Sequence, residues 1–386
     1  MKKLLIPVVK YVKWVYKIYY YLFGFMLKFL KIMIKPDENL ILINSYGGKK
    51  YDDSPKVLYE AMQRDTRFNN YKIVWAFHEP EKFEIPGAQK IKTDTLEYFK
   101  TALAARCWIT NSAIERGLNF KGKKTFYFNT WHGSPIKKMG ADILKSPSKV
   151  KSNVDMMTAQ SDFEADIFSR VFNIPRENFL LCGLPRNDVL VKYTENQRKS
   201  ILKKLGLPEN KRVILYAPTF REYERDSMQN CVLAPPMNIK KWHEELSEDY
   251  VLLFRAHYEV GKVMNVTDDD FVKNMTSYPN LNDLMIASDI LISDYSSIFF
   301  DFSVMDKVML HFTYDYETYS SKRGMYFDIR DMINGASNED DVIEILKNMD
   351  WEKEKKATEQ FRNKYLNYYG NAVEKSLDCI IENIGE

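Results

Sequence analysis

Short apolar runs alternate with amphipathic stretches along most of the chain beyond residue 36. In the first half, the apolar runs predict buried strands at residues 40–44, 71–77, 107–110, 125–129, 154–159 and 179–182. The stretches between them predict helices over residues 54–62, 94–105 and 161–172, the first with Ser54 as its cap and Pro55 in its first turn. Strands and helices that alternate in this way predict a parallel sheet with helices on both faces.

A second series of strands follows a polar, helix-prone connection at residues 193–211. Strands are predicted at residues 212–217, 250–254, 289–293 and 307–312, and helices near 340–348 and 351–385 close the chain. We therefore expect an α/β protein with two doubly wound domains, at residues 36–190 and 191–386. Ligands in such folds bind at the carboxyl ends of the strands, which places the site in the cleft between the domains.

Residues 1–35 differ from the rest of the chain. They contain eight lysines and no acidic residue, which leaves 48 basic and 53 acidic residues elsewhere. They lack a signal-peptide cleavage site, and their longest lysine-free run, residues 18–27, is far shorter than the ~20 residues that span a bilayer. At about 100° per residue, six lysines fall within roughly 60° of one another on a helical wheel. We expect an amphipathic helix on an anionic membrane surface; the alternative is a core helix with a solvated lysine face.

The composition excludes several kinds of site. With 45% apolar and 28% charged residues, the chain is typical of globular proteins. The four cysteines, at 107, 182, 231 and 379, form no CxxC pair and have no histidine at metal-ligand spacing, so neither a disulfide framework nor a metal site is predicted and a reducing compartment is expected. Walker and GxGxxG motifs are absent from the sequence, and no nucleic-acid partner is expected.

Polar clusters follow five of the predicted strands. They are TWHGS (130–134), PTFRE (218–222), RAHY (255–258), SDYSS (293–297) and SKRGMYFD (321–328). One such cluster is explained by a turn, but five in the same topological place indicate a ligand site.

Two of these clusters contain histidines. His132 can exchange a proton near neutral pH, and Gly133 beside it permits close backbone approach by a substrate. The alternative for His132 is a buried, hydrogen-bonded histidine at a strand end. Arg255 and His257 are two residues apart, so in a strand they point the same way and face one anion together. The alternative is an exposed surface pair.

The SDYSS cluster has the pattern of a helix start. Ser296 and Ser297 offer hydroxyls beside free backbone N–H groups, which favours a phosphate. A plain helix cap by Asp294 or Ser296 is the alternative, and the two roles are compatible. A glycine-containing loop at residues 44–56 either contacts a substrate or forms only a turn.

Taken together in this order, TWHGSPIKKMG, APTFRE, FRAHY, SDYSSIFFDF and RGMYFD resemble the CDP-glycerol glycerophosphotransferase family of teichoic-acid synthesis. The resemblance extends over most of the chain beyond the first segment. It implies a GT-B-like fold, with two Rossmann-like domains and a cleft between them. It also implies a peripheral protein at the cytoplasmic face of the membrane in Gram-positive bacteria. The implied reaction moves glycerol phosphate from CDP-glycerol to a lipid-linked acceptor and releases CMP.

The resemblance also implies roles for individual residues. His132 is the base that deprotonates the acceptor hydroxyl, and His257 is the second catalytic residue. Donor binding is expected of Arg255, His257, Asp294, Ser296, Ser297, Thr219, Arg221 and Arg323. Acceptor binding is expected of Trp131, Gly133, Ser134, Lys137 and Lys138. Side chains then neutralise the transferring phosphate without a cofactor, while a Mg²⁺ requirement stays open.

The sequence favours a primase-like member, because polymerases of the family are often longer. The expected acceptor is a disaccharide on undecaprenyl diphosphate. A short polymerase, a ribitol-phosphate or capsule enzyme, a nucleotide-sugar glycosyltransferase of the same fold and an inactive membrane scaffold are the alternatives. A scaffold would have no need of His132, Arg255 and His257.

Overall fold

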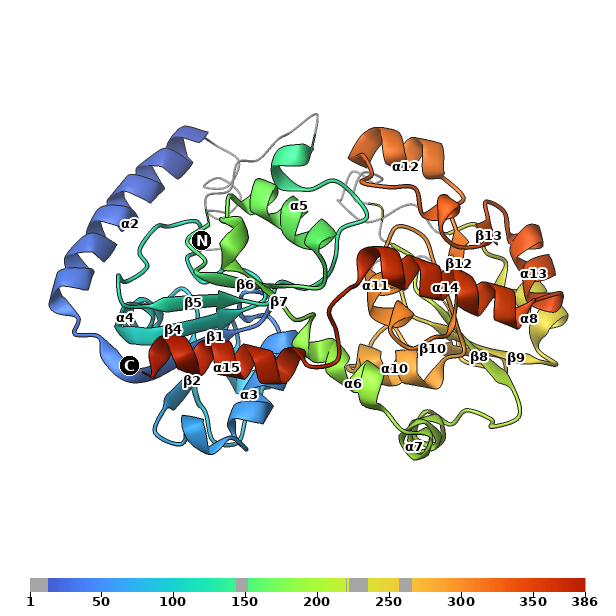
Figure 1. The fold of residues 1–386 in the computed structure, drawn as a ribbon, viewed down its shortest axis with the longest axis horizontal. Coiled ribbons are helices and arrows are strands. Elements are labelled where there is room, and N and C mark those ends of the chain that lie inside the picture. Colours follow the sequence, from blue (N-terminus) through green and yellow to red (C-terminus); the bar gives the residue numbers. More distant parts are fainter. Residues whose placement is uncertain (1–12, 144–151, 220, 222–234, 257–265, 386) are drawn as a thin grey trace.

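The structure, a computed structural model, describes residues 13–143, 152–219, 221, 235–256 and 266–385. Two parallel sheets form two units that lie side by side (Figure 1). The two parallel sheets and the helices around them confirm the predicted α/β class.

The first sheet has the order β3-β2-β1-β4-β5-β6-β7, and every pairing in it is parallel. Its strands are β1 (Asp37–Asn44), β2 (Lys72–Phe77), β3 (Gln89–Lys92), β4 (Ala105–Thr110), β5 (Phe126–Asn129), β6 (Met156–Ala159) and β7 (Phe179–Leu181). The buried residues of α4 (Leu96–Ala104) and α5 (Asp162–Phe172) form one core with one face of this sheet. Those of α3 (Asp53–Met62) and α15 (Ala372–Ile384) form another core with the opposite face. The continuous apolar runs of the strands are thus explained by burial on both faces.

The second sheet has the order β10-β9-β8-β11-β12-β13 and is also parallel. Its strands are β8 (Arg212–Tyr216), β9 (Tyr250–Phe254), β10 (Val272–Asn274), β11 (Ile290–Ser293), β12 (Val308–Phe312) and β13 (Gly335–Ala336). One face packs on α7 (Glu195–Leu205), α10 (Leu281–Ala287), α11 (Ile298–Ser303) and α14 (Trp351–Tyr365). The other packs on α8 (Ile239–Leu246) and α13 (Glu339–Lys347). Two further α-helices are α6 (Asp188–Lys192) and α12 (Tyr316–Arg323).

Three strands of the structure were not predicted from the sequence: β3, β10 and β13. All three lie at sheet edges, and they contain only four, three and two residues. A short edge strand buries few side chains and so leaves no continuous apolar run. The predicted cap of α3 is also wrong: Asp52, not Ser54, precedes the helix, and its side chain accepts from the N–H of Asp53.

The last predicted helix, residues 351–385, is two helices in the structure. α14 packs on the second sheet, and the chain then crosses back so that α15 covers the first sheet (Figure 1). Leu377 and Ile380 of α15 are buried in the same core as Ile41 and Trp75 of the first sheet. The expected second domain, residues 191–386, therefore ends in a helix that packs with the first. A break at Gly370, whose φ is +89°, allows the turn between the two helices.

The described part of the predicted N-terminal helix is present as α2 (Lys13–Met33), along the outer edge of the first unit (Figure 1). Residues 1–12 of the predicted helix lie outside the described residues. Leu27 is buried in the first unit, and Tyr20, Leu30 and Ile34 pack beside it. Within the described part of the chain, no helix has both the length and the apolar character that a bilayer crossing requires.

Candidate active site between the two units

The two units meet where the loop after β5 faces the loop after β11. Gly133 lies so close to Ser297 that a Cβ at position 133 would stand 2.7 Å from the Ser297 hydroxyl oxygen. Both residues were predicted to belong to the site, and both follow the carboxyl end of a strand. The structure therefore brings the TWHGS and SDYSS clusters together across the interface.

His132 is held in one tautomer by the backbone. Its Nδ1 lies 2.6 Å from the carbonyl oxygen of Asn111, which follows β4. Because a carbonyl oxygen only accepts hydrogen bonds, Nδ1 carries the proton and Nε2 has the free lone pair. Burial lowers the pKa of His132, and Arg186 adds to this, while the Asn111 carbonyl and Asp53 act in the opposite sense. A neutral imidazole with a bare Nε2 is the form that can act as a general base.

Trp131 supports the His132 ring. The two rings stack with centroids 4.1 Å apart, and Trp131 also packs against Phe168 and Phe172 of α5. Trp131 has a φ of +49°, an uncommon conformation for a bulky residue. Its predicted contact with an acceptor stays untested, but in the structure it fixes the orientation of His132.

Arg186 forms the centre of the interface. It belongs to the turn after β7, and its Nη1 donates to Asp53 Oδ2 at 2.5 Å and to the carbonyl of His132 at 3.0 Å. Its Nη2 donates to Asp301 Oδ2 of α11 at 2.8 Å. Burial alone would raise the pKa of Asp53, but Arg186 and the Tyr46 hydroxyl hold it below its ordinary value. One guanidinium thus links the first unit to the second.

Ser134, expected to bind the acceptor, is instead part of a buried network. Its hydroxyl donates to Glu164 at 3.0 Å and accepts from the side chain of Gln160 at 2.8 Å. Only 2% of Ser134 is exposed, so a substrate cannot reach it in this arrangement. Burial raises the pKa of Glu164 to about 7.

Lys137 and Lys138 lie at a second junction between the units. Lys137 pairs with Met325 in an antiparallel bridge, and the backbone N–H of Lys138 donates to the carbonyl of Gly324 at 2.9 Å. The Lys137 ammonium donates to the Tyr319 hydroxyl at 3.1 Å. Arg323, a predicted donor ligand, ends α12 immediately before this junction. The RGMYFD motif therefore joins the second unit to the segment that follows His132.

Two of the predicted donor ligands, Arg221 and Asp294, form an ion pair with each other. The buried Arg221 forms ion pairs with Asp294 at 2.8 Å and Asp315 at 2.7 Å. Asp294 is 1% exposed and also accepts from the backbone N–H groups of Thr219 and Tyr295. Among the described residues, Arg221 and Asp294 are enclosed by these partners, and their contact with a donor phosphate stays a prediction. Together they fix the loops that carry Thr219 and the SDYSS serines.

Arg255 and the two serines keep accessible polar groups. Arg255 follows β9, and its Nη1 donates to the carbonyls of Met275 and Thr276 at 2.6 Å each. Burial lowers the pKa of Arg255, while Asp52 of the first unit acts in the opposite sense. Ser296 and Ser297 are partly exposed. His257 lies outside the residues that the structure describes.

Sequence reasoning missed Asp53, Arg186 and Asn111. Arg186 follows β7 within the sequence LPRND, so the same rule that found the other clusters could have found it. Asp53 lies in the loop of residues 44–56, for which substrate contact and a turn were both left open. Nothing in the sequence identifies Asn111, because only its backbone carbonyl contacts His132.

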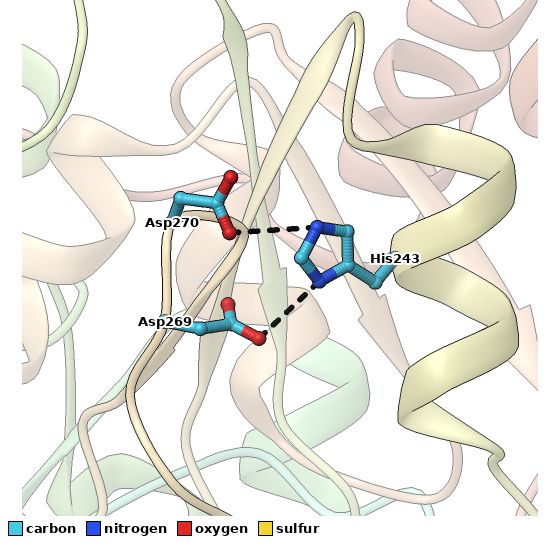
Figure 2. Close-up of side chains that lie close together, drawn as sticks. All are labelled: His243, Asp269 and Asp270. Atoms are coloured by element: carbon cyan, nitrogen blue, oxygen red, sulfur yellow. Dashed lines mark hydrogen bonds and ion pairs between the residues drawn. The ribbon is translucent and has the colours of Figure 1, made fainter.

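A separate cluster of His243, Asp269 and Asp270 lies on the second unit (Figure 2). Each ring nitrogen of His243 faces a carboxylate, at 3.3 Å for Asp269 and 3.4 Å for Asp270. Both carboxylates precede β10 and are exposed, so they lie at the amino end of that parallel strand. The site between the units is at the carboxyl ends, and the cluster is therefore not part of it.

Residues 26–382 match the model of the CDP-Glycerol:Poly(glycerophosphate) glycerophosphotransferase family. A teichoic acid poly(glycerol phosphate) polymerase of Staphylococcus epidermidis is 33% identical, over 87% of this chain and 48% of the polymerase. The chain thus spans about half the length of that relative. A teichoic acid glycerol-phosphate primase of Bacillus subtilis is 33% identical, over 68% of this chain and 70% of the primase.

The fold is similar to that of the wall teichoic acid polymerase TagF. The two structures have a TM-score of 0.82 and 30% sequence identity, and the match covers 93% of each chain. A variant of the same polymerase soaked with CDPG has a TM-score of 0.80 to this chain.

Proposed function

The chain belongs to the CDP-glycerol glycerophosphotransferase family, and on this premise we propose that it transfers glycerol phosphate from CDP-glycerol to a lipid-linked acceptor in teichoic-acid synthesis. The observation that carries the proposal is the geometry of His132, whose Nδ1 donates to the Asn111 carbonyl, so that Nε2 is the nitrogen that can accept a proton. His132 stands beside Gly133, which abuts Ser297 of the opposite unit. A base on one unit and phosphate-binding groups on the other are what an attack on a bound donor requires.

In the proposed reaction, Nε2 of His132 takes the proton of the acceptor hydroxyl. The hydroxyl oxygen forms a bond to the β-phosphorus of CDP-glycerol, and the bond from that phosphorus to the bridging oxygen breaks. CMP leaves with the electron pair. Arg255 and His257 neutralise the diphosphate and the SDYSS serines donate hydrogen bonds to it, as is needed when charge accumulates on transferring oxygens.

We propose that this reaction needs no resident metal ion. Three buried carboxylates near the described interface, Asp53, Asp294 and Asp301, are each paired with Arg186 or Arg221. Glu164, which is also buried there, accepts instead from the Ser134 hydroxyl and the backbone N–H of Gln160. Carboxylates that are already neutralised by arginine are poor candidates for holding Mg²⁺, which is usually bound by one or two carboxylates plus substrate phosphates. Transfer in excess EDTA should equal transfer in Mg²⁺; strict Mg²⁺ dependence would contradict the proposal.

We further propose that the chain performs the priming step, with a disaccharide on undecaprenyl diphosphate as acceptor. The match to the glycerol-phosphate primase at 33% identity supports this choice. The match to the polymerase at the same identity supports the alternative, in which many units are added. The deciding experiment is mass spectrometry of the product from CDP-glycerol and a short lipid-disaccharide acceptor. One added unit supports priming, a ladder supports polymerisation, and no transfer contradicts both.

The α2 helix supports a proposed location at the cytoplasmic membrane surface. At about 100° per residue, Phe25, Phe29 and Ile32 point away from the side on which Leu27 is buried. Their exposed fractions are 76%, 60% and 84%, which is unusual for large apolar side chains. Lys17 and Lys28 lie at the border between the two sides. An apolar face flanked by lysines is suited to insertion among anionic lipid headgroups.

A further inference from the structure

The Arg186 guanidinium is shared among partners that belong to both units. Asp53 comes from α3 and His132 from the loop after β5, while Asp301 comes from α11. The side chains of Arg186, Asp53 and Asp301 are only 13%, 3% and 4% exposed. We propose that Arg186 is a positioning residue that sets the place and the charge environment of His132 by joining the two units through Asp53 and Asp301. This inference rests on the proposed role of His132 as a base.

The geometry of the contact requires arginine. Its two terminal nitrogens donate in different directions, Nη1 to Asp53 and the His132 carbonyl and Nη2 to Asp301. A lysine ammonium is a single point charge and cannot reproduce this planar fork. Asn187, the next residue, donates to the second oxygen of Asp301 at 2.6 Å. The turn after β7 therefore holds α11, which begins directly after Ser297.

On the first unit, three residues near His132 have backbone conformations that are rare for residues with a side chain. Asp53 has a φ of +65°, Tyr46 one of +48° and Trp131 one of +49°. The hydroxyl of Tyr46 donates to Asp53 at 2.5 Å, and the Tyr46 ring lies 5.6 Å from the ring of His132. Residues in such conformations are energetically unfavourable and tend to cluster at functional sites. Three of them around one histidine indicate that its position matters.

Stability alone does not account for this arrangement. Burying charges requires their desolvation, and buried ion pairs are often no more stabilising than apolar residues of similar volume. The ion triad of Arg186, Asp53 and Asp301 instead fixes how the two units are aligned. Arg186 contacts both carboxylates together only when the alignment is correct. The triad thus fixes the distance between the base and the serines of the second unit.

The charges around His132 lead to a test that a merely structural role would not satisfy. Among the described residues, the charged or titratable groups facing the ring are Tyr46, Asp53 and Arg186; Trp131 stacks on it and the Asn111 carbonyl accepts from Nδ1. Arg186 disfavours an imidazolium, whereas Asp53 favours it. Removing one or the other should shift the titration of His132 in opposite directions.

The experiment follows the His132 ring by NMR in the full chain without substrate, with the signal assigned from a His132→Gln variant. Arg186→Ala should raise the midpoint of the titration, because Asp53 then acts unopposed. Asp53→Asn should lower it. Arg186→Lys should leave the midpoint near that of the wild type. The matched control is Arg176→Ala, since Arg176 also pairs with two carboxylates, Asp162 and Asp166, but on the surface of the first unit.

Turnover completes the test. Arg186→Ala and Arg186→Lys should both lower kcat, by about 10²-fold for alanine, because small displacements of a catalytic group are costly. Arg176→Ala should leave it unchanged. The proposal would be overturned if the titration midpoint of His132 shifted in the same direction in Arg186→Ala and Asp53→Asn, or shifted in neither. If Arg186→Ala does not fold, the other two variants decide. Full turnover in Arg186→Lys, or no downward shift of the midpoint in Asp53→Asn, would then overturn the proposal. Absence of transfer in the wild type would contradict the proposed function instead, and the NMR result would still stand.

Discussion

Gly133 of the first unit packs directly against Ser297 of the second, with no space for a side chain between them. A Cβ at position 133 would stand 2.7 Å from Ser297 Oγ and 3.0 Å from Ser297 Cβ. Gly133 also has a φ of +149°, which residues with a Cβ rarely adopt. The close approach of the loop that carries His132 to the loop that carries Ser297 therefore depends on a glycine at this position.

Gly133→Ala should therefore separate the two loops and lower turnover by at least about 10²-fold. Ser297→Gly removes the clash together with a proposed donor-binding hydroxyl, so adding Gly133→Ala to Ser297→Gly should cost less activity than adding it to the wild type. Steady-state kinetics with CDP-glycerol measures both. Gly24→Ala is the control, because no atom lies within 4 Å of a Cβ there. Full activity of Gly133→Ala would show that the close packing has no role in transfer.

His132→Ala should lower turnover by about 10²–10⁴-fold, the usual contribution of general acid–base catalysis. The donor should still bind, because the proposed donor groups lie on the second unit; calorimetry with CDP-glycerol measures this. In the wild type, activity should fall as the pH drops through the pKa of His132, since the imidazolium cannot accept a proton. Burial lowers that pKa, so the acidic limb should lie below the ordinary histidine value of about 6.5. If the acidic limb of the pH profile persisted in the residual activity of His132→Ala, the limb would belong to the titration of another group.

Arg255→Ala should weaken CDP-glycerol binding by about 10- to 100-fold, as expected for losing a hydrogen bond to a charged group. Its melting temperature should hardly change, because its described partners are two backbone carbonyls. Isothermal calorimetry and a thermal melt separate the two effects. Unchanged affinity would remove Arg255 from the donor site.

Arg221→Ala is the informative contrast. It leaves Asp294 and Asp315 without their ion-pair partner, and breaking a buried pair typically costs about 3–5 kcal/mol. The melting temperature should therefore fall steeply in Arg221→Ala and not in Arg255→Ala. The reverse pattern would contradict the roles proposed here for these two arginines.

This contrast shows how far the sequence could predict the site. The strand-end rule found both arginines, because it depends only on apolar runs and the residues that follow them. It could not separate Arg221 from Arg255, since the difference lies in Asp315, which is far away in sequence and adjacent only after folding. The central strands were predictable for the same reason as the clusters. The short edge strands and the return of α15 to the first sheet depend on tertiary packing and leave little local pattern.

Glu164 should make the stability of the protein depend on pH. Burial raises its pKa to about 7, so between its ordinary value of about 4.5 and pH 7 the folded state binds more protons than the unfolded state. Stability from this group is therefore lost as the pH rises through that range. Relative to the wild type, Glu164→Gln should gain about 2 to 3 kcal/mol of unfolding free energy between pH 5 and pH 8. Urea unfolding at both pH values measures this, with the exposed Glu352→Gln as control. A constant difference between wild type and Glu164→Gln would contradict the prediction.

The exposed apolar side of α2 should determine binding to membranes. Deleting the helix is a poor test, because Leu27 is buried in the core of the first unit and its removal would expose that core. Phe25→Ser with Phe29→Ser leaves this contact intact and removes two exposed apolar side chains. The double variant should bind vesicles of phosphatidylglycerol and phosphatidylcholine far more weakly in a sedimentation assay, because insertion depends on the apolar area buried.

The lysines at the border of that side should contribute through charge. Lys17→Gln and Lys28→Gln should each weaken binding by about 1 kcal/mol, or roughly fivefold, and the loss should shrink at high salt. Leu96→Ser is the matched control, since Leu96 is a 55% exposed apolar side chain on α4 rather than α2. Wild-type binding by the phenylalanine double variant would mean that α2 does not insert. If the wild type bound neutral and anionic vesicles equally, the lysines would have no role in the interaction. If the lysine variants lost binding to anionic vesicles alone, the role of the lysines would be confirmed.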